Sequence, residues 1–188
     1  GVTDQIGYPQ LPTTSVLLGI PSMAQVNISV VTEDSKIIDD LSDLSPAPNQ
    51  ILNGETGLVE VSYQQNRDVY SQPILFPDSP AMVEEYGWLR DQRFVKIALY
   101  PFQFLPSEGG VVWHNKIVVH VNFIGITGSS NQVLPRTITN ENYEKLLQEN
   151  ILNYDMAKAW RTPPSMGALQ QTTIEGERLR IVVQRDGL

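Results

Sequence analysis

The 188-residue sequence contains no cysteine, which excludes disulfides, thiolate metal ligands and a cysteine nucleophile within these residues. Basic residues are scarce: 13 Lys and Arg stand against 21 Asp and Glu, and the net charge of −8 argues against nucleic-acid binding. No run of about 18 apolar residues is present, so the sequence predicts no membrane span.

Residues that could carry chemistry are equally few. The two histidines, His114 and His120, would lie about 20 Å apart along one strand, so we expect exposed strand positions and no shared metal. No calcium loop, phosphate-binding glycine loop or Gly-x-Ser-x-Gly motif occurs, and Glu84 and Glu85 would point to opposite sides of a strand. The sequence therefore predicts a chain with no catalytic residues, no metal and no other cofactor.

Alternating apolar residues dominate the first two thirds of the chain. Two runs within residues 94–123 flank a Pro, Ser and Gly segment, a pattern that predicts a β-hairpin whose first strand ends or bulges at Pro101. Residues 16–20 and 26–31 predict a second hairpin. We expect a mainly β domain, an antiparallel β-sandwich-like fold with one C-terminal helix. Within it Trp88 and Leu89 are expected as core anchors.

The later residues divide the chain further. Apolar residues at three- and four-residue spacing predict one helix over 141–160, capped by Thr139 or Asn140 and stopped by Pro163 and Pro164. We therefore expect a sandwich domain at 1–138, the helical segment at 139–161, and a linker at 162–177. Residues 178–188 would form the first strand of a following domain in a longer, exported polypeptide.

Several motifs share their order and spacing with a known family. They are Gly7-Tyr-Pro-Gln-Leu-Pro, Leu44-Ser-Pro, Trp88-Leu-Arg-Asp-Gln-Arg, Ile97-Ala-Leu-Tyr-Pro-Phe-Gln-Phe-Leu-Pro, and the apolar strand at 116–123. Together they resemble the N-terminal propeptide of gingipain-type cysteine peptidases. The resemblance implies a secreted or cell-surface precursor, and a prodomain that assists folding of a caspase-like catalytic domain, its partner, and holds it latent. The catalytic residues would lie beyond Leu188.

In the gingipain branch, a loop after the equivalent of residues 44–46 offers a basic residue to the specificity pocket of the peptidase. The corresponding loop here, residues 45–59, contains no Lys or Arg. Three readings follow from this departure. In the first, Asn53 binds in a specificity pocket of different preference. In the second, Arg67 enters the pocket from the connection that follows the loop. In the third, the prodomain does not occupy the active-site cleft of the peptidase. Asn53-Gly54 is also simply a favourable turn.

The resemblance also implies cleavage in an exposed segment, and residues 165–176 contain no basic residue. Arg161, Arg178 and Arg180 are the basic residues that flank this region. Arg161 precedes two prolines closely, and the other two would be shielded once their strand is paired. We expect activation that does not require cleavage after Arg or Lys.

An adhesion or carbohydrate-binding β-sandwich module is the alternative function. Four aromatic residues would supply its stacking platform, although large aromatic residues in strands also serve as core. They are Trp88, Trp113, Tyr63 and Tyr70.

Overall fold

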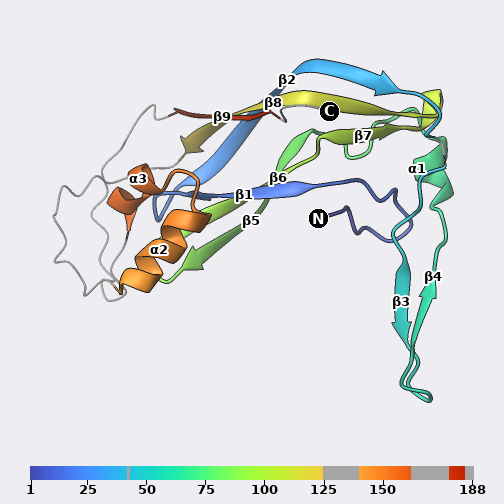
Figure 1. Ribbon diagram of the computed structural model, residues 1–188, viewed down its shortest axis with the longest axis horizontal. Coiled ribbons are helices and arrows are strands. Elements are labelled where there is room, and N and C mark those ends of the chain that lie inside the picture. Colours follow the sequence, from blue (N-terminus) through green and yellow to red (C-terminus); the bar gives the residue numbers. More distant parts are fainter. Residues whose placement is uncertain (42, 125–139, 162–177, 185–188) are drawn as a thin grey trace.

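The computed structural model describes residues 1–41, 43–124, 140–161 and 178–184. Two antiparallel sheets pack against each other (Figure 1). One sheet has the order β1-β6-β5, with β1 at Thr14–Gly19, β6 at Gln92–Leu99 and β5 at Ala81–Leu89. The other has the order β2-β8-β7, with β2 at Gln25–Ile38, β8 at Gly110–Ile124 and β7 at Phe102–Leu105. The expected mainly β, sandwich-like fold is confirmed.

The core lies between the two sheets. Leu18, Val95 and Ile97 from the first sheet pack with Val119 and Val121 from the second, and all five are fully buried. Residues two apart in a strand share a face, so the alternation in the sequence predicts these inward positions correctly. Trp88, in contrast, is 51% exposed, and its expected role as a core anchor is wrong.

The hairpin predicted over 94–123 is confirmed at its turn, where β7 pairs with β8, but wrong in its first strand, β6; the hairpin predicted over 16–31 is wrong. β6 pairs with β1 and β5, whereas β8 pairs with β2, and with β7 across the short helix η1 (Pro106–Glu108). β1 and β2 likewise lie in different sheets. Pro101 does end the strand as predicted, but the chain then crosses to the other sheet instead of turning back. An alternating pattern specifies the buried face of a strand and leaves its hydrogen-bonding partner open.

The predicted single helix is divided into three. α2 (Glu141–Asn150) is followed by α3 (Tyr154–Ala157) and the 3-10 turn η2 (Lys158–Trp160). Asn140 caps α2 as expected, while Thr139 lies outside the described residues. The helix breaks because residues 151–153 bind the free edge of β1: Leu152 N donates to Leu17 O, and the Asn153 amide bonds both backbone groups of Gly19.

The last described strand, β9 (Arg178–Gln184), pairs antiparallel with β8. β2 pairs with nearly the whole length of one edge of β8. β7 and β9 therefore share the other edge, where β7 pairs with its beginning and β9 with its later residues. The assignment of β9 to a following domain stays a prediction. The expected linker at 162–177 lies outside the described residues.

A separate two-stranded hairpin projects from the body of the molecule (Figure 1). It consists of β3 (Asn49–Leu52) and β4 (Val59–Ser62), and the short helix α1 (Arg67–Ser71) follows it. The sequence predicts only a surface loop over most of this hairpin. In the described part of the chain no helix is long and apolar enough to cross a membrane.

Candidate functional site

The N-terminal segment holds both ends of the β3–β4 hairpin. On the β3 side, Gly7 N donates to Ala47 O at 2.9 Å and Ala47 N donates to Tyr8 O at 2.7 Å. On the β4 side, Asn66 N donates to Gly7 O at 2.9 Å. Gly7 adopts a φ of +79°, and a Cβ there would lie 3.0 Å from Gln64 O, so glycine suits this junction. The hairpin therefore projects from a hydrogen-bonded base.

The two faces of the hairpin differ in polarity. Leu52 lies opposite Val59 and Gln50 lies opposite Val61, so these four residues share one face. The opposite face carries Asn49, Ile51, Glu60 and Ser62. On the first face Leu52 is 67% exposed, Val59 56% and Val61 48%. We name these three side chains the apolar face of the hairpin.

The turn at the tip of the hairpin is organised by Asn53. Its Oδ1 accepts from Glu55 N at 3.0 Å and Thr56 N at 3.1 Å, and its Nδ2 donates to Glu60 Oε1 at 2.7 Å. Gly54 stands at the open end of this turn, where an added Cβ would meet no atom within 4 Å. The structure thus places Asn53 and Gly54 together at the tip, and the expectation of a favourable turn is confirmed.

Arg67 is not at the tip. It is the first residue of α1, five positions beyond the last residue of β4, and Figure 1 shows α1 at the end of the hairpin away from the turn. Its side chain is exposed. The structure therefore does not bring Arg67 and Asn53 together.

Of the three flanking arginines, Arg161 is bonded to helix α2. Its Nη1 and Nη2 donate to Glu144 at 2.7 and 3.0 Å, and its guanidinium lies over the ring of Tyr154. These hydrogen bonds lower the pKa of Glu144 below its ordinary value. Arg178 and Arg180 belong to β9, where they lie opposite Asn122 and His120 of β8. All three belong to elements apart from the projecting hairpin.

The proposed aromatic platform is dispersed over several elements. Tyr70 belongs to α1 and packs on Phe104, with its hydroxyl donating to Leu44 O. Trp113 is on β8 beneath Lys36, and Trp88 is on β5 in the other sheet. Tyr63 follows β4. The structure does not gather these four residues into one binding surface.

His114 is buried, so its expected exposed position is wrong; His120 is half-buried. His114 Nε2 lies 2.6 Å from Gln103 Oε1, and Nδ1 lies 2.8 Å from Ser35 Oγ. Gln103 Nε2 in turn donates to Pro77 O. Burial lowers the pKa of His114. The partners come from β2 and β7, which local sequence could not reveal.

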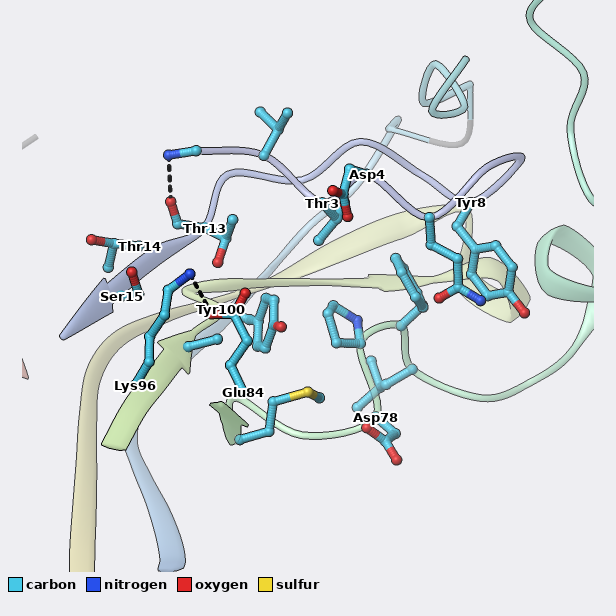
Figure 2. Close-up of a pocket in the computed structure, with 18 residues that line it drawn as sticks. Thr3, Asp4, Tyr8, Thr13, Thr14, Ser15, Asp78, Glu84, Lys96 and Tyr100 are labelled. Carbon is cyan, nitrogen blue, oxygen red and sulfur yellow. Dashed lines mark hydrogen bonds and ion pairs between the residues drawn. The ribbon is translucent and has the colours of Figure 1, made fainter. Parts of the chain in front are cut away.

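A cleft of about 580 Å³ lies beside the N-terminal segment. Figure 2 shows Lys96 and Glu84 meeting at one side of it, with their charged atoms 3.1 Å apart. Burial, followed by the charges of Glu84, Asp4 and Asp78, raises the pKa of Tyr100 at the cleft wall. Among the described residues no group of three or more His, Cys, Asp or Glu could hold a metal ion. Polar and apolar side chains line this cleft in similar measure.

Comparison with known proteins identifies the family. The family model described as Propeptide_C25 matches residues 2–159, and the chain belongs to this family, the propeptides of gingipain-type cysteine peptidase precursors. It is the non-catalytic propeptide of such a precursor. No curated protein matches it.

Two solved structures share the fold. One is described as a complex of Porphyromonas gingivalis RgpB pro- and mature domains: TM-score 0.63, 21% identity, covering 82% of this chain and 77% of that chain. The other concerns the zymogenic latency of gingipain K from Porphyromonas gingivalis: TM-score 0.51, 19% identity, covering 65% of this chain and 68% of that chain. At these identities the likeness shows the fold alone.

Proposed function

We propose that this propeptide assists the folding of the catalytic domain of its own precursor and holds that domain latent, with the β3–β4 hairpin as the inhibitory element. Membership of the propeptide family supports the role, and the RgpB structure is by its description a complex of pro- and mature domains. We further propose that the precursor is a cysteine endopeptidase that is secreted or displayed at the cell surface.

The projecting hairpin is the observation that carries this proposal. Its strands stand clear of the sandwich, and the hydrogen bonds of the N-terminal segment fix its base (Figure 1). A pre-ordered hairpin loses little conformational entropy on binding, and its free strand edges can pair with a strand of the partner. It therefore has the shape and the order that entering a substrate cleft requires.

The specificity of the peptidase is part of the proposal. Neither Lys nor Arg occurs between residues 37 and 66, and Arg67 stands at the base of the hairpin. The hairpin therefore carries no basic side chain, and residues 165–176, the expected cleavage region, contain none either. We propose that the peptidase does not require Arg or Lys. Activation would then cut within 165–176, and the flanking Arg161, Arg178 and Arg180 would not be needed as cleavage sites.

Inhibition in trans tests the proposed function. The chain is added to the separately purified catalytic domain, and peptidase activity is followed as the propeptide concentration rises. We expect wild-type propeptide to inhibit. Replacing residues 50–61 by a short Gly-Ser linker should weaken inhibition by at least about a hundredfold, because the main contact is removed. Circular dichroism and thermal unfolding establish that this variant keeps its sandwich.

Leu146→Ser is the matched control, since Leu146 is an exposed apolar residue on α2, at the far end of the molecule from the hairpin (Figure 1). It should inhibit like wild type. A wild-type chain that binds a glycan array and leaves the catalytic domain active would refute the inhibitory role and favour the adhesion module instead.

A further inference from the structure

We propose that the hairpin contacts the catalytic domain with the side chains of its apolar face and not with a side chain at its tip. Leu52, Val59 and Val61 would pack into an apolar groove with a basic rim, while Asn53 stays within the turn and enters no pocket. This inference rests on the proposed inhibitory function. It specifies which atoms of the hairpin make the contact and what chemistry the receiving surface must have.

The exposure of the apolar face is the first argument. Three aliphatic side chains on one side of a two-stranded sheet are about half or more exposed, and Leu58 in the turn is 67% exposed. A lone two-stranded hairpin is only marginally stable in water, and covering its apolar side stabilises it. Contiguous exposed apolar surface of this kind is typical of an interaction site.

The opposite face has a different character. Glu60 on this face accepts the hydrogen bond from Asn53 Nδ2, and Asn49 and Ser62 form a polar pair near the base. Ile51 is its only apolar member and is 56% exposed, the same fraction as Val59. The hairpin is therefore amphipathic, with one side suited to a groove and the other to water.

Asn53 spends both acceptor sites of Oδ1 and one N–H of Nδ2 on bonds within the hairpin. Its acceptor oxygen bonds two backbone amides of the turn, and its amide group bonds Glu60. Inserting this side chain into a pocket would break three hydrogen bonds and open the turn. The energy of binding therefore comes from the strands and not from the residue at the tip.

Charge specifies the rim of the receiving groove. Between residues 37 and 66 the chain carries five acids and no base: Asp39, Asp40, Asp43, Glu55 and Glu60. Two of them, Glu55 and Glu60, belong to the hairpin itself. A groove edged with Lys or Arg would complement this surface, whereas an acidic rim would repel it.

A pair of matched substitutions tests the inference. Val59→Thr/Val61→Thr places hydroxyls on the apolar face, and Ile51→Thr makes the same kind of change on the opposite face at equal exposure to Val59. Threonine keeps the β-propensity of valine and isoleucine, so the hairpin should persist. We expect the inhibition constant to rise about tenfold per valine site, and less than about threefold for Ile51→Thr.

The swap Asn53→Asp/Glu60→Gln reverses the donor and acceptor of the tip hydrogen bond and keeps the acceptor for the turn amides. We expect inhibition within about threefold of wild type. A loss of about a hundredfold would place Asn53 in a pocket and overturn the inference. An equal or larger loss from Ile51→Thr than from the valine pair would overturn it as well.

Two further outcomes distinguish a failure of this inference from a failure of the proposed inhibitory function. If wild-type propeptide fails to inhibit, the proposed function fails and the inference falls with it. If wild type inhibits but the valine pair has no effect, only the inference is refuted. Sedimentation should show a monomeric propeptide. A dimer that Val59→Thr/Val61→Thr dissociates would mean that a second copy covers the apolar face, which also overturns the inference.

Discussion

Asparagine side chains order the backbone at several points in the described part of the chain. Asn53 closes the hairpin turn, Asn66 caps α1 and Asn140 caps α2. Asn153 bonds both the N–H and the C=O of Gly19, as a neighbouring strand would. A short amide side chain can donate and accept at once, which is why it can replace missing backbone partners at element ends. These four residues therefore fix where a turn closes, where two helices begin and where the edge of β1 is covered.

At the scale of single residues, His114 predicts a pH dependence. In its neutral form Nε2–H donates to Gln103 and Nδ1 accepts from Ser35, so the buried ring is satisfied. Burial lowers its pKa below the ordinary value of 6.5, so the unfolded chain takes up the proton first as the pH falls. The contribution of His114 to the free energy of unfolding should therefore be fully present above about pH 6.5. Below that pH it should decrease by up to about 1.4 kcal/mol per pH unit.

Urea unfolding at about pH 7.5 and about pH 5.5 measures this effect. His114→Gln should remove the His114 contribution, so that the stability difference between the two pH values becomes smaller than in wild type. The matched variant His120→Gln keeps the His114 network and should keep that contribution. An unchanged pH response in His114→Gln would contradict the proposed origin of the effect.

At the scale of elements, the helical segment is joined to the first sheet by a close contact between α3 and β1. α2 and α3 cover the free edge of β1, and Leu147, Ile151 and Ala157 form a small buried cluster there. The approach is closest at Gly19, where an added Cβ would lie 2.3 Å from the Cβ of Ala157. A glycine is needed at this position because the helical segment leaves no room for a side chain.

Gly19→Ala should therefore displace α3 from β1. We expect a loss of about 1–3 kcal/mol in the free energy of unfolding, as for other overpacked sites. Gly54→Ala is the control, because no atom lies within 4 Å of its added Cβ, and its stability should stay within about 0.5 kcal/mol of wild type. Thermal and urea unfolding compare the two. Equal stability of both variants would show that α3 does not pack tightly on β1.

At the scale of the whole molecule, charge and shape act together. The net charge of −8 includes five acids without a base between residues 37 and 66, the region that contains the projecting hairpin. The sandwich holds this acidic, partly apolar element at one end of the molecule and the helical segment at the other (Figure 1). Long-range attraction to a basic rim would orient the propeptide before the apolar face makes contact.

The association rate should consequently depend on salt. Raising NaCl from about 50 mM to about 500 mM should slow binding to the catalytic domain about three- to tenfold and change the dissociation rate less, because screening acts mainly on the encounter. Stopped-flow fluorescence or surface plasmon resonance measures both rates. A rate that rises with salt would indicate an acidic rim on the catalytic domain and contradict the predicted complementarity.

Local sequence determined a large part of this structure. Alternation identified Val95, Ile97, Val119 and Val121 as inward-facing, a proline ended β6, and Asn140 marked the start of a helix. These features depend on residues a few positions apart, so a local pattern is sufficient to predict them. The absence of catalytic motifs and the order of the family motifs along the chain also indicated a propeptide.

Only the tertiary structure decided which strands pair, where the helix breaks and what the loop at 45–59 becomes. β6 and β7 are neighbours in sequence but belong to different sheets. Asn153 interrupts a helical pattern because β1 offers it two backbone groups 134 residues away. The expected loop is a hairpin because the N-terminal segment holds its two ends together. Each of these outcomes depends on hydrogen bonds between distant segments, which a local pattern does not encode.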